Sequence, residues 1–278
     1  MSETAHTQLA VNRAPRGWLP ELGLRELLRF RELVLILAVR DVQVRYKQTL
    51  LGVAWAVLQP LLGVAVFTVV FGRIAGLSSE GVPFPVFAYV GLTAWNYISR
   101  ATDAAAQSLL VSRELVTKVY FPRLLAPLAA LGPGLIELGI ALVLGIGFFF
   151  AYGTPLEPQV VLLPLAIVAA ALVAASVGIW LCALNVEYRD VAVILPVGLQ
   201  LWFYASPVVW SPTIFDGAER WLIALNPAVG VIDLFRWMLI GLPAPPPADL
   251  AGVASTALLL VTGTIHFLRA ESRFADVI

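Results

Sequence analysis

The distribution of charged and apolar positions changes abruptly between residues 40 and 60 of the chain. The first eight positions of this stretch, RDVQVRYK, carry four charged side chains, of which three are basic. From Leu50 onward no charged residue occurs for roughly twenty positions, about the length of a helix that crosses the hydrocarbon core of a bilayer. The pattern predicts a membrane-spanning helix that is preceded by a basic, water-facing segment, residues 40–47.

Further apolar stretches follow, each ended by charged residues, glycine or proline. They predict six membrane-spanning helices and an all-α polytopic fold, with residues 22–278 as a single transmembrane domain. The predicted spans are about 50–71, 85–105, 124–152, 160–184, 191–210 and 250–268.

An amphipathic helix is predicted ahead of the first span, over residues 22–39. Its charged positions recur at three- and four-residue steps, which brings them to one helix face. These positions are Arg25, Arg29, Glu32 and Arg40. Such a helix lies in the membrane interface with its apolar face in lipid. The alternative, that it begins the first span, is opposed by the charges that follow it. Residues 1–21 are expected to form a flexible tail.

Residues 211–248 do not fit a full span. They hold two short apolar pieces, 221–225 and 229–242, which are flanked and separated by prolines. Neither piece is long enough to cross a bilayer with confidence. We therefore expect short re-entrant or interfacial helices before the last span.

The composition supports a membrane protein. Hydrophobic residues make up 60% of the chain and charged residues only 13%, and the mean hydropathy is +0.87. A soluble domain carries about 25% charged residues, so this chain has too little charge to cover a water-facing surface. The formal net charge is zero, which gives no bulk attraction to nucleic acid. With one cysteine and two distant histidines, we expect no disulfide and no metal site.

The basic residues set the orientation. Under the six-span topology, fifteen of the eighteen lysines and arginines fall on the side of the two termini. The other side holds only Arg73, Arg220 and Arg236. Because basic loops stay in the cytoplasm, both termini are predicted to be cytoplasmic.

Motifs for catalysis are missing from the sequence. It contains no GxxxxGK[ST] phosphate loop and no HExxH, GxSxG or CxxC motif. Uphill transport by this chain would therefore take its energy from a partner or an ion gradient. Glu137 is the one acid well inside a predicted span. It is either functional or a bundle-facing group that is protonated or paired with a polar neighbour.

Aromatic residues are enriched in and near the predicted spans. Some of them fit an aromatic belt at the lipid headgroups. Others are candidates to line a passage, because ring faces bind the apolar faces of sugars in contacts weak enough for cargo to leave. The candidate channel residues are Trp55, Trp95, Tyr97, Trp202, Phe203 and Tyr204.

The segment 108–123 mixes charged residues with apolar residues that we expect to be exposed. A solvated loop needs no such apolar residues, so we favour a docking helix for a cytoplasmic partner. Its candidate contact residues are Arg113, Glu114, Leu115, Lys118, Tyr120 and Phe121.

Five blocks carry a family resemblance, and they lie in order across nearly the whole chain after residue 22. They are RDVQVRYKQTLLGVAWAVLQP, SRELVTKVYFPRLLAPL, NVEYRDVAVILPVGLQLWFYASPVVW, LNPAVGVIDLFR and ESRFADVI. Together they resemble the permease subunit of type-2 ABC exporters. The nearest branch exports cell-surface polysaccharides and polyol phosphates, such as O-antigen, capsule and teichoic-acid-like polymers.

The resemblance implies a homodimer in the bacterial plasma membrane that binds two copies of a separate ABC ATPase subunit. It implies that ATP and magnesium bind to that ATPase and that this chain binds no cofactor. The 22–39 helix would lie at the cytoplasmic interface, residues around Arg113–Phe121 would couple to the ATPase, and residues 207–242 would form re-entrant helices near an outer gate. The cargo would be a lipid-linked polysaccharide that passes through a channel at the dimer interface.

Two other functions stay open from the sequence. A type-2 ABC exporter for a drug or a lipid would share the same architecture. A polytopic membrane glycosyl- or acyltransferase would need convergent acids or histidines near one face, and Asp216, Glu219, Asp233 and His266 do not form a recognisable set.

Overall fold

The computed structural model describes residues 31–46, 54–113, 121–188 and 190–277, and every regular element in these residues is a helix. This confirms the all-helical class, while the predicted tail and the residues Arg25 and Arg29 lie outside the described part. The elements are α2 (Arg31–Tyr46), α3 (Ala54–Phe67), η1 (Thr68–Ile74), α4 (Phe84–Val111), α6 (Leu125–Ala129), α7 (Gly132–Ala151), η2 (Pro158–Leu162), α8 (Leu163–Glu187), α9 (Val191–Tyr204), η3 (Pro212–Ile214), α10 (Gly217–Ala224), α11 (Pro227–Ile240), η4 (Pro247–Asp249) and α12 (Leu250–Val277).

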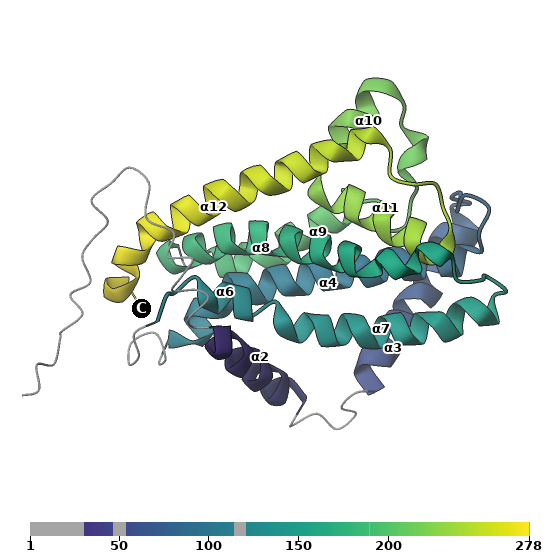
Figure 1. Cartoon of the computed structure of the whole chain (residues 1–278). Coiled ribbons are helices and arrows are strands. Elements are labelled where there is room, and N and C mark those ends of the chain that lie inside the picture. Colours follow the sequence, from purple (N-terminus) through teal and green to yellow (C-terminus); the bar gives the residue numbers. More distant parts are fainter. Residues whose placement is uncertain (1–30, 47–53, 114–120, 189, 278) are drawn as a thin grey trace, which may run out of the picture.

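The long helices form an elongated bundle (Figure 1). Helix α8 packs against both α4 and α12, and α4 packs against α7 on its other side. One end of the bundle holds α2, α6 and the C-terminal end of α12. The other end holds α10 and the start of α12. Each end of the bundle therefore brings together segments that are far apart in the sequence, and the long apolar helices run between the two ends.

Among the described residues, three helical stretches are long and apolar enough to cross a membrane. They are Leu125–Ala151, Pro158–Glu187 and Pro247–Glu271, and they match the predicted spans 124–152, 160–184 and 250–268. The first of them is interrupted between α6 and α7, where Gly132 and Pro133 begin the second helix. Two shorter apolar helices, Leu58–Ile74 and Val191–Tyr204, correspond to the predicted spans 50–71 and 191–210.

Helix α4 extends beyond its predicted span. It runs for 28 residues to Val111, whereas the apolar pattern predicted an end at 105. The charged residues Arg100 and Asp103 lie inside the predicted span 85–105 and inside the helix. No proline follows Pro85 until Pro122, so nothing in the backbone stops the helix there. At 1.5 Å per residue, α4 is about 42 Å long, longer than a hydrocarbon core.

Helix α9 is shorter than its predicted span. It ends at Tyr204, and residues 205–210 form turns in which the Val208 amide donates to the Ser206 carbonyl at 2.7 Å. Pro207 explains the early end, because the residue before a proline is pushed out of the helical region. The predicted end at Trp210 is therefore wrong by six residues.

The bounds of helix α2 differ from those of the predicted interfacial helix. The predicted end at residue 39 is wrong: the described helix begins at Arg31 and continues to Tyr46. Neither glycine nor proline occurs between Arg31 and Gly52. The charged residues 40–46 therefore continue the helix. Leu37 is buried against the bundle, where α2 packs on α6 and α7. Ile36 and Val39 are exposed, which leaves an apolar face available to lipid.

The two short helices before α12 confirm the prediction of short helices in this region. α10 and α11 meet at a bend of 98°, a geometry that fits either a broken span or a re-entrant loop. Asn226 makes the bend: its Oδ1 accepts a hydrogen bond from the Ala228 amide at 3.1 Å and so caps α11. Pro227 follows at the first position of that helix, where a missing N–H costs nothing.

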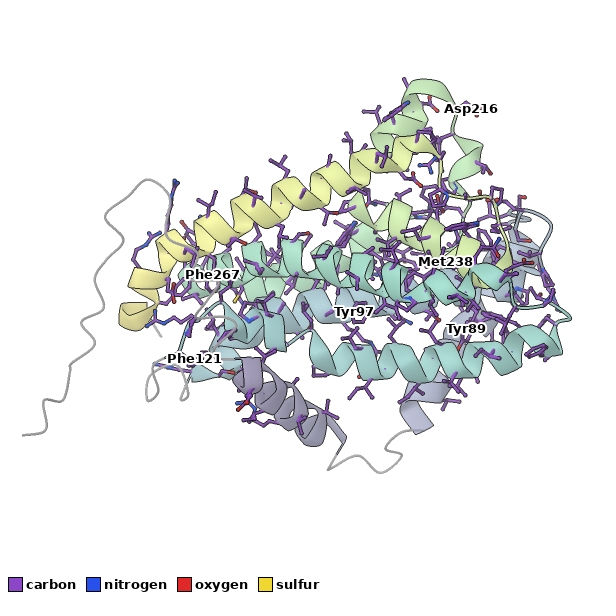
Figure 2. The ribbon with its side chains drawn as sticks, viewed as in Figure 1. Tyr89, Tyr97, Phe121, Asp216, Met238 and Phe267 are labelled. Atoms are coloured by element: carbon purple, nitrogen blue, oxygen red, sulfur yellow. The ribbon has the colours of Figure 1, made fainter. Side chains whose placement is uncertain are left out.

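The buried core falls into two clusters of apolar side chains. The larger one joins α4, α7, α8 and α11, and it contains Tyr89, Tyr97 and Met238, which Figure 2 shows along the middle and one end of the bundle. The smaller one lies at the opposite end and includes Phe121 and Phe267.

Candidate functional site

A groove opens between α3, α4 and α9, with a volume of about 560 Å³. Its lining combines aromatic rings and hydrogen-bonding side chains with smaller apolar residues. The rings are Phe67, Trp95, Phe203 and Tyr204, and the polar residues are Gln59, Asn96, Ser99, Arg100, Asp103 and Gln200. Every one of these residues lies on a helix of the apolar bundle, so the groove is a polar and aromatic path along otherwise lipid-compatible elements.

The rings of the groove form one connected array. Trp95 meets Phe203 edge-on with centroids 5.8 Å apart, and Phe203 contacts Phe67 at 5.6 Å and Tyr204 at 5.2 Å. These separations lie within the range of favourable aromatic pairs. The array therefore joins α3, α4 and α9 into one wall.

Three of the six predicted channel aromatics line this groove: Trp95, Phe203 and Tyr204. Trp202 supports the wall from behind: its ring meets Trp95 edge-on at 5.3 Å, and its Nε1 donates to Asn226 Oδ1 at 2.8 Å. Trp202 is thereby tied to the bend between α10 and α11. The side chain of Trp55 lies outside the described residues.

Tyr97 lies on a different face of α4 from Trp95. It lines a smaller cavity of about 30 Å³ together with Glu137 of α7, which has room for a water molecule. Gln59, Asn96 and Arg100 line both cavities. The two spaces are therefore neighbours that share polar walls.

Arg100 is the polar centre of both cavities. Its Nη1 lies 2.5 Å from Glu137 Oε2, and its Nη2 donates to Gln59 Oε1 at 2.6 Å. One guanidinium thus connects α4 to α7 and to α3. The structure gives Glu137 the polar partner that the second interpretation allows. Sequence reasoning missed Arg100 as that partner, although an acid in an apolar span calls for a cation in reach.

A second ionic cluster lies between α10, α11 and η4. Arg220 Nη2 lies 3.1 Å from Asp233 Oδ2 and 2.6 Å from Asp249 Oδ1. Arg236 lies 3.8 Å from Asp233 Oδ1 and donates from Nη2 to the Val208 carbonyl at 3.0 Å. These contacts hold the bent pair of helices against the start of α12.

The predicted docking segment is only partly described. Arg113 is exposed at the end of α4, and the residues Glu114, Leu115, Lys118 and Tyr120 lie outside the described part. Phe121 was expected to be exposed and is instead buried, with an exposed fraction of 4%. It packs with Phe267 and Phe274 of α12, because an apolar ring next to these rings is more stable out of water.

The segment after Phe121 is also fastened to α12. Arg123 Nη1 donates to the Glu271 carbonyl at 2.5 Å, and the Arg123 amide donates to Glu271 Oε1 at 3.3 Å. A further ion pair joins Arg273 of α12 to Glu187 of α8 at 2.6 Å. On the other side, Arg40 of α2 donates to Ser112 Oγ at 3.3 Å. Helix α2 thus contacts one end of the predicted docking segment and α12 contacts the other.

The remaining acids and histidines of the enzyme alternative are scattered. In the part of the chain that the structure describes, no group of three or more His, Cys, Asp or Glu side chains could hold a metal ion. His266 stacks on Trp180 at 4.8 Å, while Asp233 is engaged by arginines.

Comparison with known proteins agrees with these features. A family model described as ABC-2 type transporter matches residues 32–240. The chain is 31% identical over 259 residues to the O-antigen export system permease protein RfbA of Myxococcus xanthus, which covers 91% of this chain and 98% of that relative. Two proteins of the same name from Klebsiella pneumoniae are 25% and 21% identical, each over 89% of this chain and 95% of the relative. These matches confirm the resemblance to type-2 ABC export permeases of the O-antigen branch. The chain therefore belongs to the ABC-2 type transporter family.

Proposed function

We propose that this chain is the membrane-spanning subunit of an ABC exporter that moves a lipid-linked, O-antigen-like polysaccharide out of the cytoplasm. The observation that carries the proposal is the groove between α3, α4 and α9, whose lining contains both aromatic rings and amide and hydroxyl groups. Rings pack on the apolar faces of sugars, while the polar groups exchange hydrogen bonds with sugar hydroxyls. The relatives named as O-antigen export permeases support this cargo.

The proposed topology has six crossings with both termini in the cytoplasm of a bacterium and the chain in its plasma membrane. The crossings are α3 with η1, α4, α6 with α7, η2 with α8, α9 with residues up to Trp210, and α12. In this topology α10 and α11 form a re-entrant pair at the outer side. The distribution of basic residues supports it, as does the neutralisation of Arg220 and Arg236 by nearby aspartates on that side.

The active exporter would be a homodimer with two copies of an ABC ATPase, which would bind ATP and magnesium. Gln59, Gln200 and Tyr204 on the groove are exposed in the single chain. A second copy related by a two-fold axis would close two such grooves into one path, because the same surface then faces itself. A single bundle of this size leaves the groove open to lipid.

This proposal is tested by purifying the tagged chain from its native membrane and identifying what comes with it, and by comparing surface glycans of wild-type and deletion strains. We expect an ABC ATPase to copurify and one surface polysaccharide to be lost, with its lipid-linked precursor accumulating inside. Loss of drug resistance or an altered lipid composition, with normal glycans, would favour the alternative exporters. If no ATPase copurifies with the chain and the purified chain has transferase activity, the enzyme alternative would be favoured.

Coupling to the ATPase is proposed to run through residues Arg113–Tyr120. The support is the position of this segment. The hydrogen bond from Arg40 to Ser112 fixes one end of it to α2, and the hydrogen bonds from Arg123 to Glu271 fix the other end to α12. Reversing the charge of Glu114 or Lys118 is expected to abolish most export while the partner still binds ATP. Export by membrane vesicles and nucleotide binding by the ATPase are measured in parallel. Wild-type export from these variants would remove the coupling role.

The groove proposal makes a separate prediction for Tyr204. Its side chain is 58% exposed, so Tyr204→Ala is expected to reduce glycan export by roughly an order of magnitude through loss of about 1 kcal/mol or more of ring contact, with little change in stability. Tyr152→Ala, which removes a comparably exposed ring outside the groove, is the control. Equal export by the two variants would mean that Tyr204 belongs to the aromatic belt at the lipid headgroups and does not contact the cargo.

Trp95 is a poorer probe than Tyr204. Its exposed fraction is 5%, and it packs on Trp202 and Phe203. Trp95→Ala would leave a cavity that costs about 3–5 kcal/mol. A loss of export in that variant would therefore mix the loss of a groove ring with a loss of folded protein.

A further inference from the structure

The charges around the groove discriminate between two classes of polymer. O-antigen-like polymers differ in whether their repeat units carry phosphate or carboxylate groups. A path for polyanions needs cationic side chains that are free to meet each passing charge. The described residues that line the groove and the cavity beside Glu137 contain a single cation, Arg100. A further cation, Arg40, lines a third cavity that shares Asp103 with the groove.

Arg100 is already engaged at both terminal nitrogens. Nη1 is paired with the carboxylate of Glu137, and Nη2 is bound to the amide oxygen of Gln59. An anionic cargo group would have to displace these partners, which come from two other helices. The guanidinium therefore acts as a bridge between helices and is a poor site for a passing anion.

The acids outnumber this cation. Asp103 lines the groove one turn beyond Ser99, where it accepts a hydrogen bond from Gln107 at 2.7 Å. Glu137 lines the adjoining cavity. Counted over the groove and the cavity beside Glu137, one positive and two negative side chains leave an excess of one negative charge. A two-fold partner copy would double each charge and keep the sign, so polyanions would be repelled.

The uncharged lining fits a hydroxyl-rich chain. Gln59, Asn96 and Gln200 present amides that both donate and accept hydrogen bonds. These groups bind sugar hydroxyls whatever the linkage, while Phe203 and Tyr204 offer ring faces beside them. Contacts of this kind are repeated along the groove and carry no charge requirement.

We propose that the groove selects glycans whose repeat units are uncharged, and that it disfavours polymers with a phosphate or carboxylate in each repeat. The inference rests on the proposed function, because it assumes that the cargo passes along this groove. It narrows the cargo to one chemical class within surface polysaccharides.

The test uses the permease reconstituted in vesicles with its copurified ATPase. Two lipid-linked polymers of the same length and the same lipid are supplied, one neutral and one with a uronic acid in each repeat. We expect the neutral polymer to be exported faster by at least about tenfold, since crossing an excess of like charge raises the barrier for every repeat.

Variants at Asp103 sharpen the test. Asp103→Lys changes the excess charge of the lining from negative to positive, so the neutral-to-charged export ratio should fall by about tenfold or more, and Asp103→Asn should fall between it and wild type. Glu219→Lys introduces the same charge at an exposed position of α10, outside both cavities, and should leave the ratio unchanged. The ratio is insensitive to a general loss of active complex.

Each outcome has a distinct meaning. Equal or faster export of the charged polymer by the wild type, or a ratio that does not respond to Asp103→Lys, would overturn the selectivity while leaving glycan export intact. Export of neither polymer by a complex that hydrolyses ATP would overturn the proposed function, and the selectivity with it.

Discussion

Replacing Arg236 with alanine should destabilise the folded chain by about 3–5 kcal/mol, the range for removing one partner of a buried ion pair. The Arg236 side chain is 2% exposed. Its guanidinium carbon lies 3.6 Å from the centroid of the Phe87 ring, and its Nη2 satisfies the Val208 carbonyl. Alanine leaves that carbonyl without its donor and Asp233 without one of its two cations.

The measurement is the midpoint of thermal unfolding in detergent, which should fall by roughly 10 °C for a loss of this size. Arg73→Ala is the matched control, because Arg73 is an exposed arginine that the topology places on the same side. Arg236→Met retains much of the stem over Phe87 and should give an intermediate loss. A midpoint for Arg236→Ala equal to that of the Arg73 variant would contradict the structural role of the cluster.

Gly91→Ala should also destabilise the fold strongly. A Cβ atom at Gly91 would lie 2.2 Å from the Val208 carbonyl oxygen, which is far inside contact distance. This oxygen belongs to the backbone and is held by Arg236, so it has little freedom to retreat. Helix α4 and the turn after α9 would have to separate, at a cost of about 1–3 kcal/mol or more.

Gly139→Ala is the control for this substitution. Gly139 lies in α7, and an added Cβ there meets nothing within 4 Å. Because alanine favours a helix over glycine by up to about 1 kcal/mol, this variant should be unchanged or slightly more stable. If both variants unfold at the same temperature in detergent, the close approach between α4 and residue 208 does not exist in the protein.

The sequence predicted the three long apolar stretches and misjudged the ends of α2, α4 and α9. The spans near 124–152, 160–184 and 250–268 contain long runs without charge, so hydropathy alone places them. The end of α4 was placed six residues too early because the apolar pattern weakens after Arg100 and Asp103. Inside the bundle Arg100 is paired with Glu137 and Gln59. That pairing depends on how three helices pack, and no local pattern records it.

The sequence predicted that aromatic rings line a common site, but it identified only some of the residues that do so. Rings near 95 and 203 do gather at one groove, but Trp95 and Tyr97 occupy different faces of α4 and serve different cavities. Phe121 shows the same difficulty. An apolar ring in a charged segment indicates a contact, and the sequence does not say whether the contact is another protein or α12 of the same chain.

The attachment of Arg123 to Glu271 joins residues 148 positions apart. During synthesis from the N-terminus at about 5–20 residues per second, Glu271 follows Arg123 by roughly 7–30 s. The surface that we propose for ATPase binding would therefore be completed only when the chain is almost finished. Partner recruitment would then be delayed until the helices are inserted, and a truncation or bulky tag close to residue 271 would disturb a surface that is distant in the sequence.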